Sequence, residues 1–200
     1  MTVPGPVRSR PAAPPSWRPT PPACRPAPPV GRPASRVGRV ALAGIGNEMR
    51  HDDGVGPVVA RRAAWLSAAP GGGFVTALAS PLNEPLDLLD DWDGDDLGIV
   101  VDAVRSGTPP GTVSLTWLGQ LVDVVLPTNC ARASTHGLGV ADVFRLACEI
   151  GLAPRRVALV GIEGRDFTHG KGLSPAVEEG AARALALVVD LSRAAQAATA

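Results

Sequence analysis

The sequence lacks the features of membrane-spanning, secreted and disulfide-stapled chains. No apolar run reaches the 18 residues typical of a transmembrane helix, and the first residues contain no continuous apolar core of a signal peptide. The three cysteines, Cys24, Cys130 and Cys148, show neither paired nor CxxC spacing, which favours a reducing compartment over a disulfide framework. We therefore expect a cytoplasmic protein without a membrane partner, in which Cys148 is a core residue.

The common signatures of peptide hydrolases are absent as well. The chain contains no G-x-S-x-G elbow and no H-E-x-x-H helix, and none of its cysteines adjoins a base in a recognisable motif. If the protein cuts a peptide bond, an ordinary side-chain nucleophile is not visible in the sequence.

Acidic residues are missing from residues 1–36, which hold six arginines and 12 of the 21 prolines. Such a segment buries too little apolar surface to offset its ordering entropy, so we expect a disordered tail. A dispensable tail and a Pro/Arg arm that binds a partner both stay open. Residues 37–200 carry 13 basic and 19 acidic side chains, a formal charge of −6 that argues against nucleic acid as a partner.

Residues 37–200 alternate between strand-like and helix-like patterns. Apolar runs predict strands at residues 39–44, 73–79, 97–104, 111–118 and 155–163. Apolar residues at helical spacing predict helices at residues 57–69, 84–92, 137–151 and 174–196. Ser174 can cap the last helix, with Pro175 in its first turn. This order predicts one domain, a three-layer α/β/α sandwich with a twisted, mostly parallel sheet of about five strands and an edge strand at 111–118.

Gly44-Ile45-Gly46 follows the first predicted strand and forms half of a dinucleotide-binding fingerprint. The full fingerprint needs glycine at position 49, where this chain has Met49, and an acid at the end of the second strand, which is missing. The loop also places Asp52 and Asp53 where a pyrophosphate requires backbone donors. The glycines therefore predict a tight turn, in which Asn47 bonds nearby backbone groups.

Three polar residues follow the carboxyl ends of predicted strands, where sites form in parallel sheets. Asp53 lies in the loop after the first strand, Asp102 ends the run 97–104, and His136 stands just before a helix. Two carboxylates and an imidazole suit a divalent first-row metal such as nickel or zinc. From the residues alone, three alternatives stay open: a helix cap for Asp53, a buried hydrogen-bonded acid for Asp102, and a structural loop histidine for His136.

Other polar residues are weaker candidates. His51 and Asp52 flank the first ligand and either support it or are solvated, and we favour solvation. His169 lies in a glycine-bounded loop where a surface role is expected, and Asp142 projects from a helix whose apolar face points elsewhere. The acidic run 90–96 has no ligand spacing, so we expect a solvated face.

From about residue 38 to 192 the chain resembles the hydrogenase maturation proteases, endopeptidases that process the large subunit of nickel–iron hydrogenase. The resemblance rests on four stretches in the family's order: "GIGNEMRHDDGVGP" (44–57), "VVDAVRSGTPPGTV" (100–113), "STHGLGVADV" (134–143) and "VALVGIEG…GLSPAVEEG" (157–180). One departure lies at "ASPLNEP" (79–85), where many relatives carry a glycine-rich stretch such as "DGG", so substrate choice there stays open.

The resemblance implies that Asp53, Asp102 and His136 bind a metal and are the catalytic residues. It further implies that the partner is the large-subunit precursor of a hydrogenase and that nickel, the only cofactor, arrives with that precursor. The protease would remove a C-terminal extension. The size and acidity of the chain, apart from the resemblance, fit a monomer that meets its partner transiently. The docked ion could polarise the scissile carbonyl or lower the pKa of a bound water, with Asp53 as a possible base. A chaperone that senses the metal without cutting is the alternative.

Overall fold

The computed structural model describes residues 39–75, 77–78, 84–92, 97–119 and 139–198. The predicted tail at 1–36 and most of the irregular segment after residue 119 lie outside this range. Within the described residues, no helix combines the length and the apolar character needed to cross a membrane.

A five-stranded sheet forms the centre of the fold, as the sequence predicts. Its strands are β1 (Val40–Gly44), β2 (Ala77–Leu78), β3 (Leu97–Val104), β4 (Val113–Gly119) and β5 (Arg156–Glu163). They lie in the order β2-β1-β3-β5-β4, and all neighbours are parallel except β4, which pairs antiparallel with β5. The strand β4 is therefore at an edge, and it is more exposed than β1 or β3 because fewer side chains cover it.

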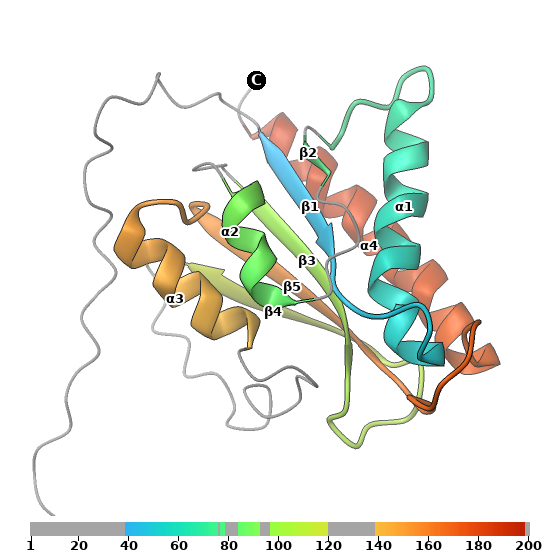
Figure 1. The fold of residues 1–200 in the computed structure, drawn as a ribbon. Helices are drawn as coiled ribbons and strands as arrows, with labels where there is room; N and C mark the ends of the chain where they lie inside the picture. Colours follow the sequence, from blue (N-terminus) through green and yellow to red (C-terminus); the bar gives the residue numbers. More distant parts are fainter. Residues whose placement is uncertain (1–38, 76, 79–83, 93–96, 120–138, 199–200) are drawn as a thin grey trace, which may run out of the picture.

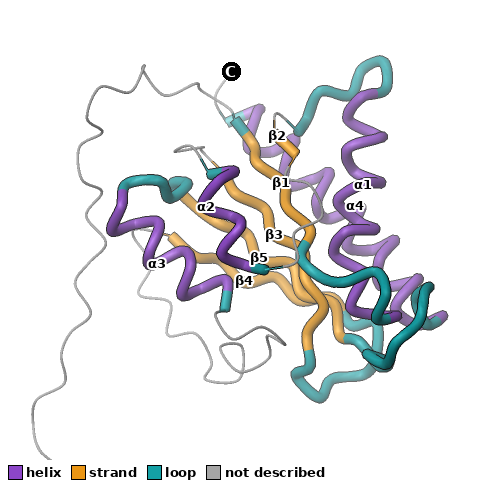
Figure 2. Tube along the Cα trace, viewed as in Figure 1, coloured by secondary structure: helices purple, strands orange, loops and turns teal. Residues whose placement is uncertain are grey.

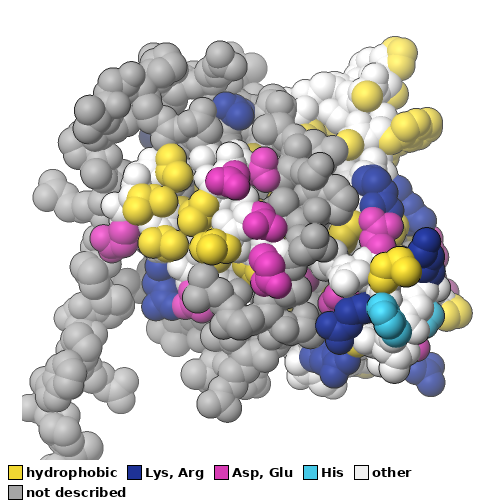
Figure 3. Space-filling model, viewed as in Figure 1, with side chains coloured by type: hydrophobic (Ala, Val, Ile, Leu, Met, Phe, Trp, Pro, Cys, Tyr) yellow, Lys and Arg dark blue, Asp and Glu magenta, His cyan; other side chains and the backbone are white. Residues whose placement is uncertain are grey.

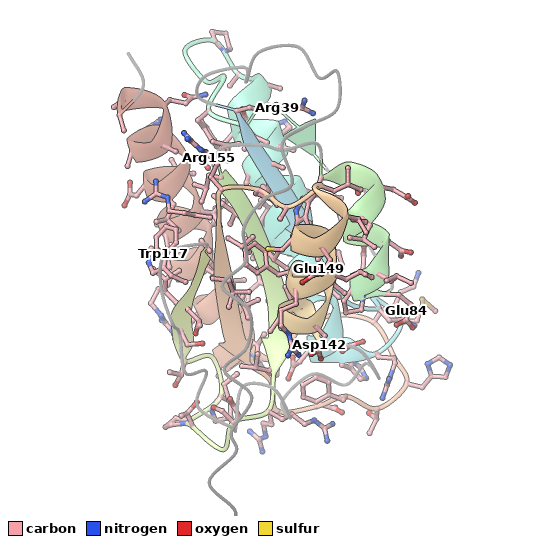
Figure 4. The ribbon with its side chains drawn as sticks, turned by 90° about the vertical axis from the view of Figure 1, so that its left-hand side faces the viewer. Arg39, Glu84, Trp117, Asp142, Glu149 and Arg155 are labelled. Atoms are coloured by element: carbon pink, nitrogen blue, oxygen red, sulfur yellow. The ribbon has the colours of Figure 1, made fainter. Side chains whose placement is uncertain are left out.

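Helices cover both faces of the sheet and complete the predicted three layers. The long helices α1 (Val55–Ala68) and α4 (Pro175–Ala197) pack on one face. The shorter η2 (Pro85–Asp87), α2 (Leu88–Asp91) and α3 (Val140–Ile150) lie on the other (Figures 1 and 2). Figure 4 shows Asp142 and Glu149 of α3 on this second side, near Glu84. Each layer thus buries an apolar face against the sheet, which is the main driving force for the fold.

The helix α3 illustrates how sequence spacing produces this packing. Its buried residues recur at the spacing of one helical face, namely Val140, Val143, Phe144, Ala147 and Cys148. The ring of Phe144 meets Trp92 edge-to-face, with the ring centroids 6.3 Å apart. Cys148 is 4% exposed, which confirms it as a core residue.

Two expectations from the sequence need correction. Cys148 is disulfide-bonded, although cysteine spacing gave no sign of pairing. Spacing along a chain does not determine which cysteines meet in space. Of the predicted strand 73–79, the described residues 73–75 do not form a strand, whereas Ala77 and Leu78 form β2. The helix α1 begins two residues before Pro57, which the first turn tolerates because its backbone N–H groups have no helical partner.

Gly44 and Gly56 bring the start of α1 into backbone contact with the ends of β1 and β3. A Cβ atom on Gly56 would lie 2.2 Å from the Ile45 carbonyl oxygen and 2.5 Å from that of Val101. Neither neighbour is a flexible side chain, so the helix could accept a larger residue only by moving away from the sheet.

We therefore expect Gly56→Ala to lower the free energy of unfolding by about 3 kcal/mol, near the upper end for overpacked positions. Urea denaturation followed by circular dichroism measures this loss. Gly119→Ala is the matched control, because no atom of the described residues lies closer than 3.7 Å to a Cβ there. Equal stability of the two variants would contradict the tight approach.

Candidate functional site

The loops that follow β1, β3 and β5 gather at one end of the molecule (Figure 1). Arg39 and Arg155, which directly precede β1 and β5, lie toward the opposite end in Figure 4. The Ile45 N–H donates to the Val101 carbonyl at 2.9 Å, so the first loop leaves the sheet directly beside β3. This is the edge of a parallel sheet at which ligand sites form.

The first loop turns tightly, as the sequence predicts. Gly46 has a φ of +134°, and a Cβ there would meet the Asp53 carbonyl oxygen at 1.9 Å, so the loop requires glycine. Asn47 accepts the Met49 N–H on its side-chain oxygen at 2.9 Å, which closes a local turn. The Asn47 N–H in turn donates to Oδ2 of Asp53 at 3.0 Å. The turn thereby orients the Asp53 carboxylate.

Asp53 lies in the short helix η1 (His51–Gly54), and Asp102 lies in β3. Their side chains are 1% and 4% exposed. Each has one carboxylate oxygen, Oδ1, that is buried and has no hydrogen-bond partner within the described residues. An unpaired buried oxygen is costly, and a cation bound between two such oxygens removes the cost. The pair therefore suits a metal ion, and oxygen ligands accept divalent cations.

Electrostatics indicate that the two carboxylates influence each other. The pKa of Asp102 is raised to about 7, mainly by burial; a backbone hydrogen bond at Ala103 lowers it, and the negative charge of Asp53 contributes to the rise. Two neighbouring acids in a desolvated place resist carrying two charges unless a cation is present.

This raised pKa predicts a pH-dependent effect of Asp102→Asn on stability. Between the ordinary pKa of 3.8 and the folded value of about 7, the unfolded chain ionises Asp102 while the folded protein retains the proton. Wild-type stability therefore falls as pH rises through this window, whereas asparagine does not titrate. We expect the metal-free variant to be more stable than wild type at pH 8, by roughly 1–4 kcal/mol, with the difference vanishing near pH 4. Thermal unfolding across pH checks this, and a gap that does not change with pH would contradict it.

Asp52 is fully buried, so the expectation that it is solvated is wrong. Its Oδ2 accepts the N–H groups of Arg165 at 2.9 Å and Asp166 at 2.8 Å, together with the Ser174 hydroxyl at 3.0 Å. Its Oδ1 accepts the Ser174 N–H at 2.6 Å. Ser174 precedes α4 as predicted, but its hydroxyl serves Asp52 and does not cap the helix. Asp52 thus fastens the first loop to the segment between β5 and α4.

Backbone hydrogen bonds join the same two segments. The N–H groups of His51 and Gly170 donate to the carbonyls of Gly170 and Met49, both at 2.9 Å. His51 is half-buried, with Nδ1 3.2 Å from the Gly172 carbonyl oxygen. His169 is exposed, as expected, with Nδ1 2.8 Å from the Met49 carbonyl oxygen. The position of η1, and therefore of Asp53, is set by the segment after β5.

Sequence analysis missed Glu163, the last residue of β5, which is 4% exposed. It accepts the N–H groups of Ser106 and Gly107 at 2.9–3.0 Å and the hydroxyls of Ser106 and Thr108 at 2.7 and 3.2 Å. Burial by itself raises the pKa of Glu163, but these hydrogen bonds outweigh it and hold the pKa below 4.5. Both oxygens have partners, so Glu163 holds the loop after β3 and is not a free ligand. The sequence did contain a signal for Glu163, because it is an acid at the end of an apolar run, as Asp102 is.

The remaining predicted residues fall into two groups. Asp142 pairs with Arg145 on the surface of α3 and takes no part in the site, and Asp90 in the acidic run is exposed. His136 lies outside the described residues, as do residues 93–96 of that run and residues 79–83. Among the residues that the structure does describe, no group of three or more metal-binding side chains lies close enough to hold one ion. All three predicted ligands, Asp53, Asp102 and His136, therefore stay predictions.

Residues 84–191 match the family model of the hydrogenase maturation proteases, which is more than half of the chain. The chain belongs to this family. The match includes Asp102 and Glu163, whereas the loop with Asp53 precedes it.

Curated relatives point to the same family of maturation proteins. The hydrogenase expression/formation protein HupD of Rhodobacter capsulatus is 32% identical over 145 residues, covering 69% of this chain and 63% of that protein. HupD of Thiocapsa roseopersicina is 27% identical, over 70% of this chain and 61% of that protein. The chain thus spans less than two thirds of the length of these relatives.

Solved structures of this protease family share the fold. The hydrogenase maturating endopeptidase HybD of Escherichia coli is 26% identical with a TM-score of 0.65, covering 78% of this chain and 93% of that one. A hydrogenase 2 maturation peptidase from a Thaumarchaeota archaeon is 29% identical with a TM-score of 0.54, covering 76% and 97%. These maturation proteases confirm the open α/β sheet.

Proposed function

We propose that this member of the family is an endopeptidase that removes a C-terminal extension from the nickel-loaded large-subunit precursor of a nickel–iron hydrogenase. The observation that carries the proposal is the pair of buried, unpaired oxygens, Asp53 Oδ1 and Asp102 Oδ1, at the carboxyl edge of the sheet. The family match supplies the substrate class.

In this proposal the nickel belongs to the precursor and is not a resident cofactor, and no organic cofactor takes part. The Asn47 N–H holds one oxygen of Asp53, which leaves the other free toward a cation. Asp102 presents its free oxygen from the rigid central strand β3. His136 is the proposed third ligand, and the three residues are the proposed catalytic group.

The free oxygens make recognition depend on the metal state of the precursor. Without the ion, the two buried acids have no cation to bind, so the precursor gains no contact from them. With the ion, both carboxylates bind it and thereby fix the adjoining peptide segment. A bound divalent ion supplies Lewis acidity for peptide hydrolysis. Cleavage would therefore follow nickel insertion.

Intact mass spectrometry of the precursor, incubated with this protein in nickel-loaded and nickel-free forms, tests the function. We expect loss of a C-terminal peptide only from the loaded form, and little or none with a His136→Ala variant. Stable association without any loss of mass would replace the protease by a metal-sensing chaperone. Absence of both cleavage and association would refute the substrate.

A further inference from the structure

A cavity of about 320 Å³ opens beside the candidate site, between the loop after β1 and the segment after β5. Apolar side chains from Met49, Val58 and Leu173 contribute to its lining, and Met49 is 46% exposed. Gly54, the neighbour of Asp53 in the chain, also lines it. A volume of this size lies within the range of ligand-binding pockets.

The walls of this cavity are fixed relative to Asp53. The Gly170 N–H donates to the Met49 carbonyl at 2.9 Å, and Asp52 accepts hydrogen bonds from both ends of the segment 165–174. Hydrogen bonds between the two segments therefore hold the walls of the cavity in place.

The charge on the rim of the cavity that has no ion-pair partner among the described residues is positive, although residues 37–200 carry a net negative charge. Lys171, the one lysine of the chain, lines it and is exposed, with no ion pair to any described residue. The acid on the rim, Glu48, is paired with Arg61 on α1. Arg50 and Arg165 are exposed on the same two segments. Figure 3 shows Lys, Arg and His side chains gathered over this end of the molecule.

The other acids of these segments, Asp52, Asp53 and Asp166, do not line the cavity. Asp166 accepts the N–H and the hydroxyl of Thr168, at 2.9 and 2.7 Å, and these hydrogen bonds are the main reason that its pKa is lowered. The Arg50 Nε–H donates to the Phe167 carbonyl at 3.3 Å, so Lys171 is the cation placed at the cavity itself. A lysine between two glycines presents a mobile point charge that can reach a carboxylate in several directions.

We propose that this cavity is a substrate subsite, which binds an apolar side chain of the precursor next to the scissile bond while Lys171 pairs with an adjacent aspartate or glutamate. We assign a precursor segment as the occupant because Gly54, the residue that follows Asp53, lines the cavity. The proposed function places the reaction at Asp53. An acidic neighbour complements the charge of Lys171. The inference thus rests on the proposed function and defines its sequence preference.

Steady-state cleavage of the nickel-loaded precursor by Lys171→Gln, Lys171→Arg and wild-type protein tests this subsite. We expect Lys171→Gln to raise KM roughly tenfold, as for loss of a hydrogen-bonded charge, with kcat nearly unchanged. Lys171→Arg should restore most of the affinity because it keeps the charge. Arg145→Gln, an exposed cation on α3 across the sheet, is the matched control and should leave KM unchanged.

A second part of the experiment changes residues of the precursor in addition to those of the protease. Changing the acidic residues beside the precursor's scissile bond to amides should raise KM by the same factor, with no further rise when Lys171→Gln is combined with it. Met49→Gln should also raise KM, because it places a polar group in the apolar wall. The dissociation constant of the precursor is measured for the same set, so the subsite can be judged without cleavage.

The outcomes separate the two proposals. Wild-type cleavage with an unchanged KM and dissociation constant for Lys171→Gln overturns the subsite and leaves the function standing. Precursor that binds without being cleaved, and binds tenfold more weakly to Lys171→Gln, supports the subsite and overturns the protease function. An equal loss for Arg145→Gln overturns the subsite, since the effect would then reflect overall charge.

Discussion

An Asp53→Asn variant will cleave nickel-loaded precursor at least about 100-fold more slowly than the wild-type protein, a loss typical of a missing ligand or catalytic acid–base group. Asparagine has nearly the same shape, and its oxygen can still accept the Asn47 N–H that holds Asp53 Oδ2 at 3.0 Å. What disappears is the negative charge on the buried, unpaired Oδ1. The measurement is the single-turnover rate of mass loss from the precursor.

The slower cleavage by Asp53→Asn can be assigned to the site only if the variant is correctly folded. Asp53→Asn removes the repulsion that contributes to the raised pKa of Asp102, so we expect its unfolding temperature to equal or exceed that of the wild type. Asp90→Asn is the matched control, because Asp90 is exposed on α2, on the other face of the sheet. Near-normal cleavage by Asp53→Asn would remove this residue from the site, while equal loss in both variants would show that general charge matters.

The second large effect concerns stability. Asp52→Ala removes the acceptor of four hydrogen bonds and leaves the N–H groups of Arg165, Asp166 and Ser174 without that partner. Each buried unsatisfied group costs about 1–3 kcal/mol, so we expect a loss on the order of 4 kcal/mol. This is a large part of the 5–15 kcal/mol, roughly, that stabilises a typical domain.

Urea denaturation measures this effect, with Asp166→Ala as the control. Asp166 accepts two local hydrogen bonds from Thr168 and holds no distant segment, so its loss should lower the stability far less than that of Asp52. A denaturation midpoint for Asp52→Ala close to that of Asp166→Ala would mean that the junction between the two segments is not held by Asp52.

The strand ends and the layers were predictable because their signals are local. Apolar runs and helical spacing gave β3 with its observed bounds and placed Asp53 and Asp102 at the same edge of the sheet. Parallel strands with short connections leave few other arrangements. The tight turn at Gly46 and Asn47 was likewise encoded in a few adjacent residues.

The role of Asp52 was not predictable because its partners lie more than 110 residues away in the chain. Two adjacent acids look equivalent in the sequence, yet η1 turns one toward the segment after β5 and leaves an oxygen of the other unpaired. Glu163 was missed for the same reason, since its donors come from the loop after β3. Cys148 adds a third case, because pairing of cysteines depends on the folded chain.

The central claim is that Asp53 and Asp102 recognise the nickel carried by the precursor. The most direct test is the dissociation constant of nickel-loaded and nickel-free precursor for wild-type and Asp102→Asn protein, measured before any cleavage is detected by mass. We predict that the wild type binds the loaded form at least about tenfold more tightly, and that Asp102→Asn binds both forms with the same weak affinity. An Asp102→Asn variant that kept the full preference for the loaded form would contradict the claim.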